Sequence, residues 1–436
     1  MPSPLGDERF ELTAEQARML AATYGTPLYV LDEASMRARA RRYQAAFAAH
    51  WPRTQVTYAS KANSTLAVLR IMHQEGCLID VASEGELRAA LAAGIPAAQC
   101  HLHGNNKSPR ELAFAIESGI HQIVVDNFEE LEMLQSFGAH TPLLLRLAPG
   151  VDPKTNAKIS TGQSDTKFGF TKEWAESAVK LCLDAGLNLV GYHCHVGSQL
   201  LDPTAQVNGG EILAEFAVRV RREYGFAPEV INVGGGLGAR YTDADAPLSF
   251  EEYNAQLVGR LVPALRQADL EPTLVQEPGR SLIAEAGVTL YTVGVKKSIN
   301  LYDPKSGRYD FTRGYVVVDG GLADNPRPAL YGARHTLRHI PAEPRETQWD
   351  AVATVSGRHC ETDTLFVDVP LPIDTQRGDL IQVLTTGAYN ASMASNYNRY
   401  PRPATVLLRP DGTHQLVQRA DTYEEMLARE MVPEDL

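Results

Sequence analysis

Short apolar runs alternate with amphipathic stretches between about residues 28 and 276. In amphipathic stretches such as Glu84–Ala93 and Phe128–Leu134, apolar residues recur at spacings of three and four, which predicts helices. The short runs predict strands, and they are Gln55–Ala59, Cys77–Val81, Cys100–His103, Gln122–Asp126, Pro142–Leu147, Leu189–His193, Glu229–Val233 and Pro272–Gln276. Alternating strands and helices predict a parallel sheet. Eight strands in about 250 residues fit a (β/α)8 TIM-type barrel, with a doubly wound open sheet as the alternative.

The pattern changes from about Glu277 onward. Strand-like runs now follow one another without long helices between them, at Gly287–Val293, Tyr315–Val318, Ala351–Val355, Leu380–Leu384 and Ala404–Leu408. Pro410–Thr413 carries a hairpin signal. We therefore expect an α/β protein with a barrel over residues 28–276. A C-terminal, mainly antiparallel and β-barrel-like domain would cover residues 277–436, with residues 1–27 packing on it.

Composition narrows the choice of partners and compartment. The chain has 436 residues, 44% hydrophobic and 22% charged, and a net charge of −12 without a block of Lys or Arg. This balance argues against nucleic acid or an anionic membrane as the partner. Five scattered cysteines without CxxC spacing argue against a disulfide framework or structural zinc and fit a reducing cytoplasm. We expect a cytoplasmic protein with no membrane-spanning segment.

Reactive and backbone-permissive residues cluster where the barrel strands end. Active sites of such barrels lie at the C-terminal ends of the strands. Those ends carry Lys61, Asp80, Ser83, Arg146, His193, His195, Gly234–Gly236 and Glu277–Arg280. Consecutive glycines allow backbone amides to approach a phosphate, although a tight turn would also use them. The pattern lacks the GxGxxG spacing of a dinucleotide site.

Three of these features point to one cofactor. Lys61 follows a buried strand, where a surface lysine is the ordinary alternative and a Schiff-base lysine the functional one. His193 and His195 have a spacing compatible with zinc but lack a clear third ligand, so ring stacking and core packing remain alternatives. Glu277 could pair with Arg280 or keep a pyridine nitrogen protonated. Together with the phosphate-binding glycine backbone they describe a pyridoxal phosphate pocket, whereas a lysine-dependent aldolase would not need the stacked ring or the carboxylate.

Seven motifs carry a resemblance to a known family over nearly the whole chain. They are Tyr58–Asn63, His101–Ser108, His193–Gln199, Glu277–Arg280, Arg327–Tyr331, Cys360–Glu361 and Gly387–Tyr389. In this order they resemble the fold type III pyridoxal-phosphate decarboxylases, and most closely the meso-diaminopimelate decarboxylases of lysine biosynthesis. The resemblance implies decarboxylation of meso-2,6-diaminopimelate at its D-centre, giving L-lysine and carbon dioxide.

The resemblance also implies roles for individual residues. The residues implied to hold the cofactor are Lys61 as the Schiff base, Asp80, His195 stacked on the ring, Ser198, Gly235, Gly236, Glu277, Pro278, Gly279, Arg280 and Tyr389. Those implied to bind the substrate are Arg280, Arg327, Tyr331, Glu361 and Tyr389. Cys360 would be the proton donor. Cys360 and Glu361 would come from the second subunit of a homodimer, and no metal is implied.

One departure leaves the substrate open. The family usually continues Cys-Glu-Ser-Gly-Asp, whereas this chain has Cys360-Glu-Thr-Asp-Thr364. A same-fold decarboxylase of another amino acid, either a D-amino acid or one tethered to a carrier, is therefore an alternative. So are an amino-acid racemase, which would need two bases across the ring, and a non-catalytic pyridoxal phosphate carrier. Asn156–Lys167, polar and rich in Ser, Thr and Gly, is a candidate mobile loop.

Overall fold

The computed structural model describes residues 9–138, 140–151, 167–303, 308–349, 351–361 and 364–436. Within these ranges the chain forms two compact units. The barrel unit consists of residues 35–239 and 245–283, and the β unit of residues 9–34, 240–244 and 284–436. Residues 362 and 363 and all but the last residue of Asn156–Lys167 lie outside the described residues.

The barrel unit contains eight parallel strands that close on themselves. They are β2 (Thr54–Ala59), β3 (Leu78–Val81), β4 (Cys100–Leu102), β5 (Gln122–Val125), β6 (Leu143–Leu147), β7 (Leu189–Cys194), β8 (Val230–Asn232) and β9 (Thr273–Gln276). Parallel pairing of β2 with β9 completes the ring. The predicted barrel is confirmed, and each predicted strand has its counterpart within one or two residues at either end.

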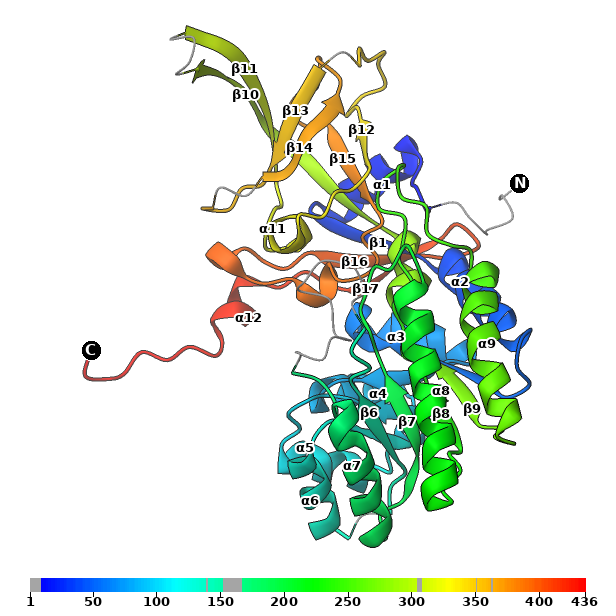
Figure 1. Cartoon of the computed structure of the whole chain (residues 1–436). Coiled ribbons are helices and arrows are strands. Elements are labelled where there is room, and N and C mark those ends of the chain that lie inside the picture. Colours follow the sequence, from blue (N-terminus) through cyan, green and yellow to red (C-terminus); the bar gives the residue numbers. More distant parts are fainter. Residues whose placement is uncertain (1–8, 139, 152–166, 304–307, 350, 362–363) are drawn as a thin grey trace. The chain divides into compact units, whose positions relative to one another are not determined.

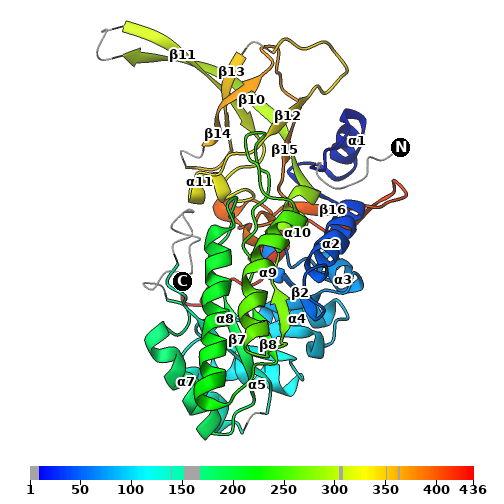
Figure 2. The same cartoon turned by 45° about the vertical axis from the view of Figure 1, so that its right-hand side comes forward.

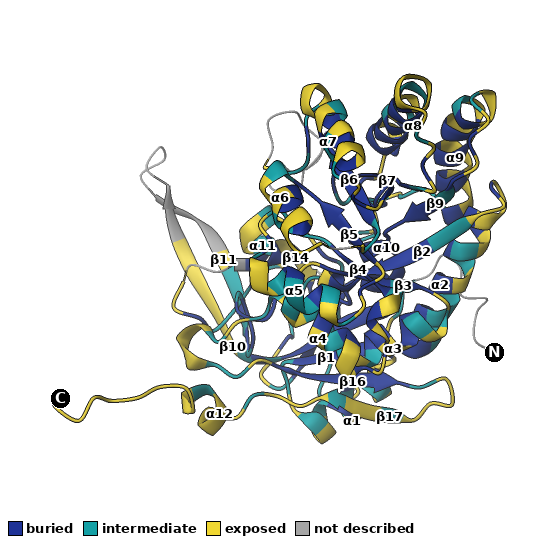
Figure 3. Ribbon diagram, turned by 90° about the horizontal axis from the view of Figure 1, so that it is seen from below, coloured by how far each residue is buried: buried dark blue, intermediate teal, exposed yellow. Residues whose placement is uncertain are grey.

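Helices surround these strands and turn their apolar faces toward them. They are α2 (Glu33–Ala48), α3 (Leu66–Gln74), α4 (Glu84–Ala92), α5 (Pro109–Glu117), α6 (Phe128–Ser136), α7 (Lys172–Asp184), α8 (Thr204–Tyr224) and α9 (Phe250–Gln267). Helices α8 and α9 lie side by side (Figure 2). Figure 3 shows the buried strands of the barrel and the exposed outer faces of helices α7 and α8. Capping boxes at Ser108 and Ser249 fix where α5 and α9 begin.

The β unit is built on a nine-stranded sheet. Its strands are β1 (Leu28–Asp32), β10 (Gly287–Asp303), β11 (Arg308–Val318), β12 (Leu337–Ile340), β13 (Ala351–Ser356), β14 (Thr364–Leu371), β15 (Leu380–Leu384), β16 (Ala404–Leu408) and β17 (His414–Gln418). Most pairs are antiparallel, whereas β1 with β16 and β11 with β13 are parallel. Strands β10 and β11 form a long two-stranded ribbon (Figure 1). The unit also contains α1 (Ala14–Tyr24), α11 (Arg327–Tyr331) and α12 (Tyr423–Leu427).

The boundary between the two units differs from the predicted one because of strand β1. The sequence pattern places residue 28 at the start of the barrel, but β1 pairs antiparallel with β10 and parallel with β16 in the second sheet. The β unit therefore includes β1, and the barrel unit continues past residue 276 to Ile283 through the short helix α10 (Arg280–Ile283). The hairpin at Pro410–Thr413 is confirmed, because it joins β16 to β17. Strands β12 and β14 were missed by the sequence pattern.

None of the helices in the described part of the chain combines the length and the apolar character needed to cross a membrane.

Candidate active site

Lys61 lies at the C-terminal end of β2, in the short 3-10 helix η1 (Ser60–Ala62). Its side chain is exposed. Burial raises the pKa of Asp80, and the positive charge of Lys61 opposes this rise. Burial lowers the pKa of His195, and the charge of Lys61 lowers it further. The amine is therefore within electrostatic range of both side chains, as the convergence of strand ends predicts.

The segment from Glu277 to Arg280 packs directly against the turn that carries Lys61. The backbone N–H of Ala59 donates to the carbonyl of Pro278 at 3.2 Å. A Cβ on Gly279 would lie 3.0 Å from the Cβ atoms of both Ala59 and Ala62, so only glycine allows this approach without displacement. The buried Arg280 donates through Nε and Nη2 to the hydroxyl of Ser198, at 3.2 and 3.0 Å. The structure therefore places the predicted site residues Arg280 and Ser198 in direct contact.

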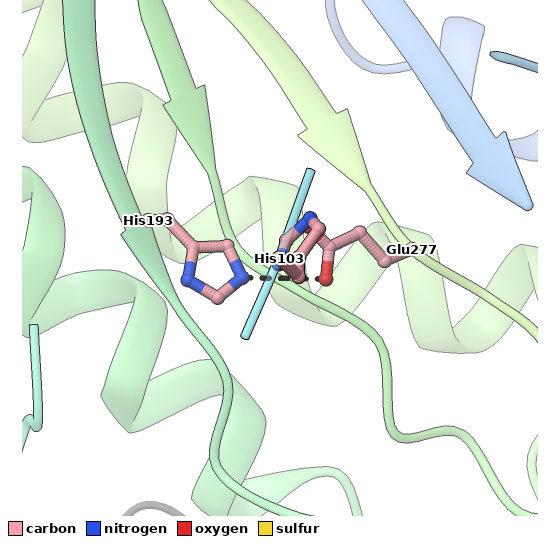
Figure 4. Close-up of side chains that lie close together, drawn as sticks. All are labelled: His103, His193 and Glu277. Carbon is pink, nitrogen blue, oxygen red and sulfur yellow. Dashed lines mark hydrogen bonds and ion pairs between the residues drawn. The ribbon is translucent and has the colours of Figure 1, made fainter. Parts of the chain in front are cut away.

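Glu277 is buried and surrounded by donors (Figure 4). Asn232 Nδ2 donates to Oε1 at 2.6 Å, and His193 Nε2 donates to Oε2 at 3.2 Å. His103 Nε2 lies 3.2 Å from Oε1. Burial raises the pKa of Glu277, but His103 and His193 outweigh that effect and hold it well below its usual range. Glu277 is therefore a buried carboxylate anion, and two of the three residues around it, Asn232 and His103, could not be assigned a role from the sequence.

His195 and the glycine turn after β8 fix each other. The backbone N–H of Gly235 donates to Nδ1 of His195 at 3.2 Å, so Nδ1 carries no proton. Burial lowers the pKa of His195 well below its usual value, which leaves a neutral, flat ring. The turn needs glycine because Gly234 and Gly236 have φ angles of +70° and +141°.

The substrate residues predicted in the β unit fall into two groups. Arg327 is only 5% exposed, and its guanidinium carbon lies 4.9, 5.4 and 5.9 Å from the ring centroids of Tyr241, Tyr331 and Tyr389. Three aromatic rings around one guanidinium attract the cation and fix its direction. Tyr241 was not singled out from the sequence.

The second group, Cys360 and Glu361, is exposed. The backbone N–H of Cys360 donates to Asn398 Oδ1 at 2.8 Å, and Tyr397 OH donates to Glu361 Oε1 at 2.6 Å. Both residues are thus held by the turn around Tyr397 and Asn398, which the sequence analysis did not single out. The following residues Thr362 and Asp363, where the chain departs from the usual family motif, lie outside the described residues.

Known proteins resemble the chain over nearly its full length. The family described as "Pyridoxal-dependent decarboxylase, pyridoxal binding domain" matches residues 33–284. Diaminopimelate decarboxylase from Bacillus subtilis is 41% identical over 426 residues, covering 96% of this chain and 94% of that protein. The chain belongs to the diaminopimelate decarboxylases.

Solved structures of diaminopimelate decarboxylases agree with this assignment. The enzyme from M. jannaschii in complex with L-lysine has a TM-score of 0.86 and 33% identity, with coverage of 99% of this chain and 98% of that chain. The Helicobacter pylori enzyme with L-lysine gives 0.82 and 31%, with coverage of 94% and 98%. The predicted fold, decarboxylase class and pyridoxal phosphate cofactor are therefore confirmed.

The barrel residues of the chain fit pyridoxal phosphate. Lys61 supplies an amine at the barrel mouth, and Glu277 supplies a buried anion suited to a protonated ring nitrogen. A Cβ at Gly235 would lie 2.1 Å from the carbonyl oxygen of Glu277, so this position requires glycine. Without a side chain, the backbone of the turn is accessible to a ligand. The backbone of the glycine turn and the hydrogen-bonded pair of Arg280 and Ser198 are both suited to bind a phosphate.

The same strand ends could also hold a metal ion. Among the described residues, His103, His193 and Glu277 place one donor atom each within 4.8 Å of the others. No clear third ligand for a histidine pair could be predicted from the sequence, and in the structure His103 and Glu277 are candidates beside His193. The expectation that the protein needs no metal stays a prediction.

Replacing Gly235 with alanine is expected to weaken binding of pyridoxal phosphate by at least about tenfold, because the new Cβ must displace the backbone at Glu277. Titration of the apoprotein with cofactor, followed by quenching of its fluorescence, measures this. Gly259→Ala in α9 is the matched control, since no atom lies within 4 Å of its Cβ and alanine favours a helix. Equal affinities in both variants would contradict the prediction.

Proposed function

We propose that the protein decarboxylates meso-2,6-diaminopimelate at its D-centre to L-lysine and carbon dioxide, the last step of lysine biosynthesis. The observation that carries this proposal is the 41% identity to diaminopimelate decarboxylase over nearly the whole of both chains. The L-lysine bound in the related structures is the product that the proposal requires. We also propose that the protein acts in the cytoplasm, which cell fractionation would test.

Lys61 is the residue proposed to bind the cofactor covalently and to release it to the substrate amine. Its place after β2, beside Gly279, supports this role. When bound, pyridoxal phosphate supplies an electron sink for the carbon that loses carbon dioxide. Glu277 is proposed to accept a hydrogen bond from the protonated ring nitrogen, because its own pKa is held low in a buried place. His195, neutral and flat, is proposed to stack on the ring.

The remaining barrel residues are proposed to hold the phosphate and ring edge. These residues are Asp80, Ser198, Gly235, Gly236, Pro278, Gly279 and Arg280. Arg280 and Ser198 already hydrogen-bond each other, so one hydroxyl and one guanidinium are positioned as donors for an anion. Arg280 is also proposed to contact the substrate's distal carboxylate.

Substrate recognition is proposed to depend on Arg327. A buried guanidinium aligned by three tyrosine rings is suited to bind the distal carboxylate in a bidentate manner. Tyr331 and Tyr389, two of those rings, would contact the same substrate. Glu361 would meet the distal amino group, and its exposure suits a role in a second subunit. We propose a homodimer in which Cys360 and Glu361 serve the partner's site.

One incubation tests the proposed function directly. Purified protein, pyridoxal phosphate and meso-diaminopimelate are mixed, and L-lysine and carbon dioxide are scored together, with Lys61→Ala as the blank. Equal amounts of lysine and gas are expected. Carbon dioxide without lysine would point to another product. Racemised substrate without gas would point to a racemase, and either result would reject the proposal.

Replacing Cys360 with alanine is expected to lower decarboxylation by about a hundredfold or more, because a positioned proton donor is lost. Cofactor absorbance should be unchanged. A mixture of Cys360→Ala and Lys61→Ala subunits is the control for the dimer, since mixed dimers would regain one intact site. Near wild-type activity of Cys360→Ala would identify another proton donor, and failure of the mixture to recover activity would reject the shared site.

A further inference from the structure

His103 lies between two buried carboxylates at the base of the candidate cofactor site. Its Nε2 is 3.0 Å from Asp80 Oδ1 and 3.2 Å from Glu277 Oε1. Both carboxylate side chains are about 95% buried. His103 follows β4, Glu277 follows β9 and Asp80 lies near the end of β3, so the barrel itself brings them together.

Two carboxylates this close cannot both stay ionised in a buried place without a cation, because like charges raise each other's pKa. Burial disfavours the cationic form of His103, but Asp80 and Glu277 outweigh it and raise the pKa of His103 to about 9. By contrast, burial lowers the pKa of His193 to about 4, so His193 is a neutral donor. His103 therefore lies against Glu277 as an imidazolium, and Lys61 and Arg146 are further cations within electrostatic range of Asp80 and Glu277, respectively.

The segment carrying His103 is held rigidly. The backbone N–H of His103 donates to the carbonyl of Val81 at 2.8 Å. The buried Lys107 donates to the carbonyls of Gly104 and Val124, at 2.8 and 2.7 Å, and forms an ion pair with Glu130. This buried lysine, four residues after His103, ties the loop to the barrel through Val124 and Glu130 and so helps to fix the direction of the imidazole.

We propose that His103 is a positioning residue that keeps Glu277 ionised and aimed at the ring nitrogen of pyridoxal phosphate. The imidazole edge of His103 lies within hydrogen-bond distance of both Asp80 and Glu277, and a donor to a carboxylate stabilises its anionic form. An anionic Glu277 attracts a protonated ring nitrogen. The inference rests on the proposed placement of the ring nitrogen at Glu277, but not on the identity of the substrate.

The test compares two ligands on the apoprotein: pyridoxal phosphate and its analogue with carbon in place of the ring nitrogen. The ratio of their dissociation constants reports the contact at the ring nitrogen alone, because all other groups are shared. Wild type is expected to prefer pyridoxal phosphate. His103→Gln keeps a hydrogen-bond donor but loses the charge, and it should lower that preference by about tenfold while leaving the analogue's affinity unchanged. His101→Gln, at a buried histidine on β4 two residues before His103, is the matched control and should keep the wild-type ratio.

Each other outcome contradicts a different part of the proposal. An unchanged ratio in His103→Gln would show that Glu277 needs no imidazolium. Equal binding of both ligands by wild type would show that Glu277 does not meet the ring nitrogen. A wild-type ratio that falls after treatment with a chelator would assign the charge balance to a metal ion at His103, His193 and Glu277. Binding ratios as expected without formation of lysine would reject only the proposed substrate.

Discussion

Alanine in place of Lys61 is expected to abolish covalent attachment of pyridoxal phosphate and to lower decarboxylation by more than about a thousandfold. The amine is the group that joins the cofactor to the protein and is also needed to free the product. In the structure it lies at the end of β2, on a turn packed against Gly279, where a methyl side chain cannot replace it. The fold should survive, since the Lys61 side chain is exposed.

Borohydride reduction of the loaded protein, followed by peptide mapping, measures the attachment. Wild type should carry the label on the peptide containing Lys61, and Lys61→Ala should carry none. Lys107 is the internal control because it lies on the same end of the barrel, yet its amine already donates to two carbonyls and to Glu130. A label on Lys107, or an unlabelled Lys61 in an active protein, would contradict the assignment.

The barrel strands could be predicted because their signals are local. Each is a short apolar run between amphipathic helices, and the alternation itself predicts parallel pairing. Membership of a sheet is not local, and β1 shows this. All five of its residues are buried, like those of the barrel strand β6, and only its pairing with β10 and β16 assigns it to the other sheet.

In the candidate site, too, only features with a local signal in the sequence could be predicted. Lys61 and Glu277 could be singled out because they directly follow barrel strands, where such enzymes carry their chemistry. The partners of Glu277 could not be assigned. Asn232 and His103 are polar residues at strand ends like many others, and their role depends on the ring closing so that β4, β7, β8 and β9 bring them within bonding distance.

Arg327 is expected to set the preference for a substrate with a distal carboxylate. Replacing it with glutamine should lower kcat/KM for meso-diaminopimelate by about 10³- to 10⁴-fold, because the carboxylate would lose a charged, bidentate partner in a buried place. Turnover of D-lysine, which lacks that carboxylate, should stay low and nearly unchanged. The preference between the two substrates should therefore collapse in the variant.

Arg327→Lys separates charge from geometry. Lysine keeps the positive charge but cannot form the planar bidentate contact or stack in the same way among Tyr241, Tyr331 and Tyr389, so most of the loss should remain. Arg334→Gln, at an exposed position shortly after α11, is the matched control and should leave both substrates unaffected. Melting temperature and cofactor absorbance should be those of wild type in the control. If Arg327→Gln kept its preference for meso-diaminopimelate, the distal carboxylate would have to be recognised by Arg280 alone, and the tyrosine-lined arginine would be a structural element of the β unit.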